Sequence, residues 1–410
     1  MRTNFTPSQL CDPHLKEAER NLRTCVHCGI CTATCPTYVL TGDERDGPRG
    51  RIAMMQQMLE DGGAPSAQAV HHIDRCLSCL GCRTACPSGV DYARLVDAAR
   101  LHIHDRHRRP LAERLLRWLI ANVLPRPKLV RAGLWLAPLG RLLPGRLGVM
   151  ARIGTGARAR PGDEIWPTRT RPIMRVALIR GCVQAALAPQ TDAAIARVLA
   201  RRGFEAMALE GCCGALVHHM GRDAQAKAFA RRLIEAFERS GAEMAMIGAS
   251  GCSAHLKDMT QLFAHEPAWQ ARAQAFVSKT RDLLELVDAT GEVSPRVAVA
   301  WQAPCSLQNG LKLADKGRQL LAACGFEVRE PVESHLCCGS AGTYAILEPD
   351  LAKRLRERKR AHLAALGADI VASANIGCQQ HLSGPGLPPV VHLAELVDWA
   401  DGGAMPRAMR

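Results

Sequence analysis

The sequence predicts a multidomain protein of α+β and α/β class, in which a mostly helical N-terminal domain precedes two duplicated α/β domains. Three observations support this prediction. Two runs of closely spaced cysteines lie within the first hundred residues. Apolar strand-like segments alternate with helical ones from about residue 173. The second half of the chain also repeats its own pattern, which indicates a duplicated domain.

Length and composition set the limits of this prediction. The chain has 410 residues, 18 of them cysteines, and 47% hydrophobic residues, which is enough for several domains with buried cores. Its first twenty residues contain no apolar export signal, so we expect a cytoplasmic protein. In that reducing compartment, clustered cysteines bind metals or do redox chemistry. No run of 18 apolar residues predicts a membrane-spanning helix.

Four segments are expected along the chain. Residues 1–100 form the domain with the paired cysteine runs, and residues 101–172 form a basic helical connector. Residues 173–295 and 296–410 form the two cysteine-rich domains. Between residues 101 and 175 there are 16 Lys and Arg against 4 Asp and Glu, a local net charge of +12. Because no nucleic-acid-binding module surrounds these charges, we expect no nucleic-acid partner.

The two N-terminal runs share the pattern C-x2-C-x2-C-x3-C-P, in residues 25–36 and 76–87. In ferredoxin-like domains this spacing holds two [4Fe–4S] clusters, and the fourth cysteine of each run ligates the other cluster. The alternative, structural zinc, prefers two separated C-x2-C pairs. We therefore expect one cluster on Cys25, Cys28, Cys31 and Cys86, and the other on Cys76, Cys79, Cys82 and Cys35. Such clusters carry single electrons, so we expect no catalytic residue in this domain.

The segment between the runs contains Arg49 and Arg51. Two interpretations are open for them. Their charges would offset the negative charge of thiolate-ligated iron and help to set its potential, or they form the solvated start of a helix.

Each α/β copy repeats a cysteine motif: one cysteine after a strand, a Cys-Cys-Gly triplet, and a Cys-x-x-His sequence after another strand. Corresponding cysteines are 123, 125 and 126 residues apart. Open α/β sheets place their sites at the carboxyl ends of strands, and Gly214 and Gly339 let the backbone bend closely there. We expect a further iron–sulfur, zinc or redox site in each copy, from Cys182, Cys212, Cys213, Cys252 and His255, and from Cys305, Cys337, Cys338, Cys378 and His381.

The alternative is that these cysteines pack as small hydrophobic residues, which accounts for Cys324 but not for positions that recur in register. The second copy adds polar groups near its cysteine pair: His335, Ser340 and Tyr344. If they have no role there, His335 is a surface loop residue and Tyr344 belongs to the core. The chain contains no dinucleotide fingerprint and no P-loop, so any flavin must be held by another subunit.

Taken together, CVHCGICTATCPTY, GDERDGPRGRI, DRCLSCLGCRTACPSGV, HLCCGSAGTYAI and ANIGCQQHL resemble the iron–sulfur subunit of glycolate oxidase (glycolate dehydrogenase). The wider group combines two ferredoxin motifs with two cysteine-rich CCG domains. The resemblance implies a hetero-oligomeric oxidoreductase with a non-NAD acceptor. Partner subunits bearing FAD oxidise glycolate to glyoxylate, and this chain passes the electrons to quinone or another membrane acceptor. Relatives with non-cubane clusters end each motif in Cys-x-x-Cys, whereas His255 and His381 stand there in this chain.

Two other functions are weighed against this one. The equivalent subunit of a lactate or glycerol-3-phosphate dehydrogenase has the same organisation, because the partner subunit selects the substrate. A non-catalytic iron–sulfur redox sensor belongs to a different class. A sensor usually carries an output module such as a helix-turn-helix, and none is visible.

Residues 108–147 mix leucines and tryptophan with arginines at helical spacing. One interpretation is an interfacial helix, with Leu111, Leu115 and Trp118 in the membrane surface and arginines on anionic headgroups. The protein would then be peripheral on the inner face of the cell membrane. The other interpretation is that the leucines pack between the domains. The arginines concerned are Arg114, Arg117, Arg126 and Arg131.

Overall fold

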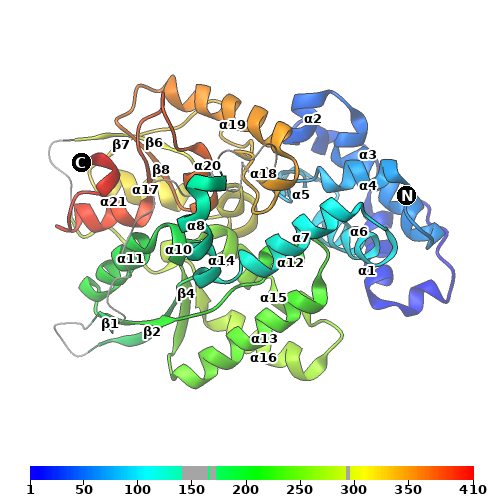
Figure 1. The fold of residues 1–410 in the computed structure, drawn as a ribbon, viewed down its shortest axis with the longest axis horizontal. Coiled ribbons are helices and arrows are strands. Elements are labelled where there is room, and N and C mark those ends of the chain that lie inside the picture. Colours follow the sequence, from blue (N-terminus) through cyan, green and yellow to red (C-terminus); the bar gives the residue numbers. More distant parts are fainter. Residues whose placement is uncertain (141–164, 167–171, 292–295) are drawn as a thin grey trace.

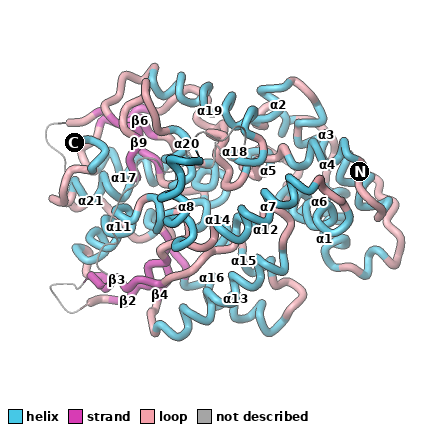
Figure 2. The backbone as a smooth tube through the Cα atoms, viewed as in Figure 1, coloured by secondary structure: helices cyan, strands magenta, loops and turns pink. Residues whose placement is uncertain are grey.

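The computed structural model describes residues 1–140, 165–166, 172–291 and 296–410. Every regular element in residues 1–106 is helical (Figures 1 and 2). The first three α-helices each begin with a proline, whose missing N–H is one that a helix start leaves unpaired. The elements are η1 (Gln9–Cys11), α1 (Pro13–Thr24), η2 (Ile30–Thr32), α2 (Pro36–Thr41), η3 (Glu44–Asp46), α3 (Pro48–Asp61), α4 (Ala67–Asp74), α5 (Gly81–Thr84) and α6 (Tyr92–Arg106).

The described part of the connector is helical up to residue 140 and includes one short strand at residues 165–166. Helix α6 continues past residue 100, where the sequence predicted a boundary, so the N-terminal helical part extends to Arg106. Helices α7 (Leu111–Val123) and α8 (Pro127–Gly140) follow. The rest of the predicted connector, apart from residues 165–166 and 172, lies outside the described residues, and so does the end of the first cysteine-rich segment at 292–295. None of the described helices combines the length and hydrophobicity that crossing a bilayer requires.

The first α/β part contains a five-stranded sheet in the order β1-β3-β2-β4-β5. Strands β2, β3, β4 and β5 pair in parallel, and β1 pairs antiparallel to β3. Its strands are β1 (Ile165–Trp166), β2 (Met174–Ile179), β3 (Phe204–Leu209), β4 (Met244–Ile247) and β5 (Thr280–Arg281). Its helices are α10 (Gln184–Leu187), α11 (Pro189–Arg201), α12 (Ala215–His218), α13 (Asp223–Ser240), α14 (Ser250–Lys257), α15 (Met259–Leu262), α16 (Pro267–Lys279) and η4 (Leu283–Glu285).

The second α/β part repeats this topology with a four-stranded parallel sheet in the order β7-β6-β8-β9. These strands correspond in order to β3-β2-β4-β5, which confirms the internal duplication. The strands are β6 (Ala298–Trp301), β7 (Glu327–Arg329), β8 (Ile370–Ser373) and β9 (Val390–His392). The helices are the π-helical η5 (Ser306–Leu311), α17 (Ala314–Ala323), α18 (Tyr344–Leu347), α19 (Pro349–Ala364), α20 (Ile376–Leu382), α21 (Leu393–Ala400) and η6 (Arg407–Met409).

The two α/β parts share one hydrophobic core. Val176 and Leu178 of β2 belong to the same buried cluster as Val299 and Trp301 of β6. Helix α11 of the first copy packs against α21 of the second. Figure 2 shows the strands in two groups, with the helical N-terminal part on the opposite side of the molecule from β6 and β9. The sheets therefore form one rigid platform for the loops at their strand ends.

Two buried carboxyl groups lie near the α11–α21 contact. Thr191 donates a hydrogen bond of 2.7 Å to Glu395 across the contact, and Gln184 donates one of 2.6 Å to Asp192. Burial raises the pKa of Asp192 and of Glu395 to about 7. Both groups are therefore protonated in the folded protein at pH values where the unfolded chain has already lost these protons.

This linkage predicts that Glu395→Gln makes stability less dependent on pH. The pKa of Glu395 is raised on folding. Its contribution to the free energy of unfolding is therefore fully present below the pKa that the group has in the unfolded chain, and is lost as pH rises through about 7. The free energy of unfolding of the unaltered protein should fall by up to about 1.4 kcal/mol per pH unit for this group. The variant keeps the oxygen that accepts from Thr191 and should lose that slope. Anaerobic urea denaturation at several pH values measures it, with the exposed Glu357→Gln as control; equal slopes in all three proteins would contradict the prediction.

Candidate metal centres

The two N-terminal cysteine runs follow the same backbone path. His27 and Gly29 in the first run have φ values of 55° and 82°, and the equivalent Ser78 and Leu80 in the second have 51° and 60°. Left-handed backbone costs a non-glycine residue roughly 1–2 kcal/mol. Its recurrence at the same positions in both runs fits a chain wrapped closely around a bound group.

One cavity in the N-terminal part is lined by cysteines from both runs. Burial, and then the charges of neighbouring thiols, raise the pKa of Cys31 to about 11. Such a thiol stays protonated at neutral pH unless a metal ion replaces the proton. The cavity brings together the four residues that the sequence predicted as one ligand set, with Cys82 also in its wall: Cys25, Cys28, Cys31 and Cys86.

The other four cysteines of the runs form a second group. Burial raises the pKa of Cys79 well above its usual value, and the nearby thiols of Cys305, Cys35 and Cys76 add to the effect. The pKa of Cys82 is raised by burial and by the thiols of this same group. Four soft donors in a buried space of this kind suit iron–sulfur ligation.

The guanidinium of Arg51 is 1% exposed and lies beside Cys35. Its Nη1 atom is 3.8 Å from the Cys35 Sγ atom, and its Nη2 atom donates a hydrogen bond of 3.0 Å to Thr37. Its Nε atom donates to the carbonyl oxygen of His72 at 2.7 Å. Arg51 is therefore not part of a solvated helix start, and its charge offsets that of the thiolates. Arg49 is more exposed and pairs with Glu44 at 2.7 Å.

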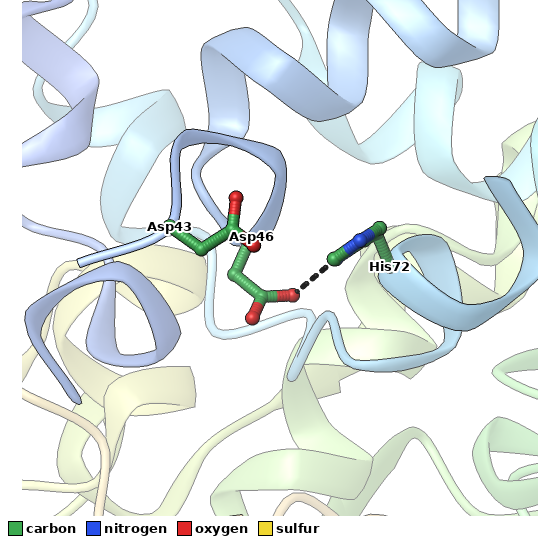
Figure 3. A group of neighbouring side chains, drawn as sticks. All are labelled: Asp43, Asp46 and His72. Carbon is green, nitrogen blue, oxygen red and sulfur yellow. Dashed lines mark hydrogen bonds and ion pairs between the residues drawn. The ribbon is translucent and has the colours of Figure 1, made fainter. Parts of the chain in front are cut away.

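Asp43, Asp46 and His72 form a group of ligand atoms next to Arg51 that resembles a cation site. The negative charge of this group is already balanced by neighbouring side chains. Asp46 accepts from His72 Nδ1 at 2.8 Å, and Asp43 lies nearby (Figure 3). The Asp46 carboxylate also accepts from Arg75 at 2.9 Å and lies 3.7 Å from Arg51. Because two guanidinium groups surround this carboxylate, the cluster stabilises the loop before α3 and offers no place for a metal ion.

The cysteines of each α/β copy contact one another at the carboxyl ends of the strands. In the first copy the Sγ atoms of Cys182 and Cys212 are 3.5 Å apart, and Cys213 contacts both Cys212 and Cys252. In the second copy the Sγ atoms of Cys305 and Cys337 are 3.7 Å apart, and those of Cys338 and Cys378 are 3.3 Å apart. The same pairs meet in both copies, so the recurrence seen in the sequence is also spatial.

The glycines after the cysteine pairs are required by close packing. Gly214 and Gly339 have φ values of 86° and 92°. A Cβ atom on Gly339 would lie 2.8 Å from the carbonyl oxygen of Ala352 in α19. Only glycine combines this backbone conformation with so close an approach.

The histidines of the Cys-x-x-His motifs make contacts of a different kind. His381 Nε2 lies 3.3 Å from the carbonyl oxygen of Ala352. The ring of His255 lies 5.3 Å from that of His218. His218 pairs with Asp97 of α6 and with Asp223; despite burial, these carboxylates raise the pKa of His218 to about 10. The contacts among the described residues therefore link His255 to a buried ionic cluster rather than to the thiols.

The second cysteine run adjoins the second α/β copy. Asn309 in η5 donates a hydrogen bond of 2.9 Å to the carbonyl oxygen of Cys79 and accepts one of 2.9 Å from Thr84. Cys79 and Cys305 also pack against one buried cluster that contains Cys337. The π-helical turn η5 thus brings the two cysteine groups together, as such turns often do at functional sites.

Two family models match the chain. A 4Fe-4S dicluster domain matches residues 24–91, and a cysteine-rich domain matches twice, at residues 176–257 and 299–383. A relative from Escherichia coli, the glycolate oxidase iron-sulfur subunit, is 39% identical over 98% of this chain and 99% of its own length. The chain belongs to the family of glycolate oxidase iron–sulfur subunits. The clusters of this family member carry electrons within an oxidoreductase complex.

One further relative agrees with this family membership, and one solved structure shares the fold. A probable glycolate oxidase iron-sulfur subunit from Bacillus subtilis is 32% identical over 94% of this chain and 95% of its own length. The crystal structure of a hypothetical protein from Helicobacter pylori superposes with a TM-score of 0.58 at 9% identity. It covers 97% of this chain and 74% of that one, and the likeness concerns the fold alone.

The structure also adds residues to the site that the sequence motifs did not indicate. Tyr92 lines the cavity of the first cysteine group, and Asn309 bridges to the second run. Their only sequence signal is position: Tyr92 follows the second run closely, and Asn309 follows Cys305 by four residues. His335 is exposed and does not belong to the buried cluster around Cys337, whereas Tyr344 is buried in that cluster.

Proposed function

We propose that this chain is the electron relay of a glycolate-oxidising complex. Oxidation of glycolate to glyoxylate releases two electrons and two protons, which flavin in partner subunits accepts. This chain takes up the electrons one at a time and passes them to a membrane acceptor such as quinone. The full-length similarity to a glycolate oxidase iron-sulfur subunit carries the proposal, and the clustered cysteines of the described residues support it.

For the ligands, we propose the crossed assignment of the two N-terminal cysteine runs. The cavity that gathers the first three cysteines of one run with Cys86 of the other supports it. The electrostatic proximity of Cys35 to Cys79 and Cys82 supports the second set. Pro36 starts α2 directly after Cys35, so the chain turns away once this ligand is placed.

For the domains, we propose the predicted order with the first boundary moved beyond the end of α6. The N-terminal domain then comprises residues 1–106 and the connector 107–172. The cysteine-rich domains keep the bounds 173–295 and 296–410.

We further propose that electrons leave the N-terminal domain toward the second cysteine-rich copy. Cys79 lies in the electrostatic environment of Cys305, and a buried apolar cluster joins the two groups. The first copy meets the N-terminal domain through ion pairs instead, such as Arg94 with Asp258 and Asp97 with His218. Packed atoms favour electron transfer where the N-terminal domain contacts the second copy. The ion pairs with the first copy hold the two domains in place.

Delivery to a membrane acceptor requires contact with the bilayer, and we propose that α7 and the start of α8 make it. Leu111, Leu115 and Trp118 are 78%, 59% and 54% exposed on one face of α7, while its opposite face packs in the core. Apolar side chains and tryptophan suit the membrane interface, and basic residues suit anionic lipid. The exposed basic residues around this face are Arg108, Arg114, Arg126 and Lys128.

Two of the arginines that the sequence assigned to this surface have other partners. Arg117 pairs with Asp74 at 3.0 Å and with Glu113 at 2.8 Å. Arg131 donates a hydrogen bond of 3.0 Å to the carbonyl oxygen of Ala185. Both guanidinium groups are engaged within the protein, so they do not face headgroups.

The activity is tested by purifying the chain with the products of its neighbouring genes. Reduction of an artificial dye should be fastest with glycolate and much slower with lactate or glycerol 3-phosphate. A preference for lactate or glycerol 3-phosphate would assign the complex to a related dehydrogenase instead.

The ligand assignment predicts that Cys35→Ser removes the cluster held with Cys76, Cys79 and Cys82. The iron content should fall by about four atoms per chain, because each cubane contains four. EPR of the reduced chain should show the same signal missing in Cys35→Ser and in Cys79→Ser. The exposed Cys11→Ser is the matched control and should keep both signals. Loss of the same signal in Cys35→Ser and Cys25→Ser would contradict the crossed assignment.

The proposed electron route predicts different effects of matched substitutions in the two copies. Cys338→Ser should lower quinone reduction by the complex by about tenfold or more, while Cys213→Ser should lower it less. Both variants should keep the N-terminal EPR signals and dye reduction by the flavin subunits, because neither residue lies in the first two groups. Equal quinone reduction by both variants and the unaltered complex would show that the cysteine pairs only pack.

The surface proposal predicts salt-sensitive binding to anionic vesicles. Replacing Arg108, Arg114, Arg126 and Lys128 with Gln should weaken sedimentation of the complex with phosphatidylglycerol vesicles, since each charge contributes about 1 kcal/mol near the surface. Changing Arg117 and Arg131 to Gln is the internal comparison and should weaken binding less. Binding that is indifferent to lipid charge and salt would assign this face to a protein partner.

A further inference from the structure

Two of the three tyrosines in this chain have buried hydroxyl groups without a partner. Tyr92 and Tyr344 are buried, and neither hydroxyl forms a hydrogen bond with any other described residue. The third, Tyr38, is partly exposed, and its hydroxyl is not orphaned in this way. A buried tyrosine hydroxyl normally has a hydrogen-bond partner. Two unpaired donors in one region therefore indicate a group that the polypeptide itself does not supply.

Both tyrosines lie against thiols of the second cysteine group, and Tyr92 also lines the cavity of the first. Tyr92 begins α6 and packs in one buried cluster with Cys76 and Cys82, to which Cys25 and Cys86 of the first group also belong. Tyr344 begins α18 and packs in another with Leu77 and Cys337, to which Cys79 also belongs. The two side chains thus approach the group from the N-terminal domain and from the second cysteine-rich copy.

The electrostatic environment of the two hydroxyls is shared. Burial raises the pKa of Tyr92, and the charged groups near it are Cys76, Arg51, Cys82 and Cys35. Burial also raises the pKa of Tyr344, whose charged neighbours are Glu348, Arg51, Cys76 and Cys337. Cys76 and Arg51 are common to both. A phenol hydroxyl is a hydrogen-bond donor at neutral pH, and both hydroxyls lie near thiols of the second group.

Hydrogen bonds to the sulfur atoms of an iron–sulfur cluster raise its reduction potential, because they stabilise the more negative reduced state. We propose that the Tyr92 and Tyr344 hydroxyls donate such bonds to the cluster held by Cys35, Cys76, Cys79 and Cys82, and so raise its potential above that of its neighbour. Arg51 adds a buried positive charge on the same side. The inference rests on the proposed ligand sets but not on the substrate. An electron in the N-terminal domain is then held at the cluster that adjoins the second cysteine-rich copy.

The test is an anaerobic redox titration of the full chain, followed by EPR with dithionite as reductant. The signal that Cys79→Ser removes identifies the second cluster. Its midpoint potential should move to more negative values in Tyr92→Phe and in Tyr344→Phe, and further in the double variant, while iron content stays unchanged. Tyr38→Phe is the matched control and should leave it in place. Unchanged midpoints in both single variants, or equal shifts of both clusters, would overturn the proposal.

A second measurement avoids the loss of the hydroxyl group. Because Tyr92 and Tyr344 are the only tyrosines left in Tyr38→Phe, 3,5-difluorotyrosine can replace both throughout this variant. The fluorinated phenol is a stronger donor and should shift the second cluster to more positive potential, opposite in sign to phenylalanine. A shift of the same sign as phenylalanine would indicate altered packing and would overturn the proposal. None of these titrations uses glycolate, so a wrong substrate assignment leaves their outcome unaffected.

Discussion

The structure depends on holding several thiolates together in buried space, where like charges repel one another and lose their hydration. The raised pKa values of Cys31 and Cys79 express this constraint directly. The fold compensates this repulsion with a positive charge and hydrogen-bond donors that the protein holds beside the thiols. Arg51 is buried beside Cys35 and is itself held by Thr37 and the backbone of His72. Bound iron supplies the remaining charge that eight thiolates require.

Local chain geometry follows from the same constraint. Cysteines three residues apart reach a common centre only if the intervening backbone turns sharply, and the left-handed residues of both runs provide this turn. Helices α2 and α3 begin with proline and are followed by a left-handed glycine, so the chain changes direction directly after Cys35 and again before the second run. The cysteine segments and the helices thus alternate along residues 1–106.

Duplication produced two chemically similar cysteine sites, but the N-terminal domain makes different contacts with the two copies. Its helix α6 joins the first copy through a partly buried ionic cluster, in which Asp97 faces His218 and Arg94 faces Asp258. Its second cysteine run joins the second copy through Asn309 and an apolar cluster. A polar junction positions the domains, while a packed apolar junction beside thiols suits electron passage. The asymmetry lies in the contacts and not in the cysteine motifs.

The sequence by itself determined the eight-cysteine pattern, the duplicated α/β organisation and the family resemblance, because spacing and repetition are properties of the linear chain. It also predicted that the backbone bends tightly at Gly214 and Gly339, because a glycine directly after a cysteine pair is visible in the motif itself. It left Arg51 undecided and was silent on Tyr92 and Asn309. It placed Arg117 and Arg131 on the lipid-facing side in one of its two interpretations, whereas both form bonds within the protein. Only the tertiary structure decided these cases, since burial and partnership depend on which distant elements pack together. Cys79 and Cys305 are neighbours because α5 meets η5, and no spacing along the chain encodes that meeting.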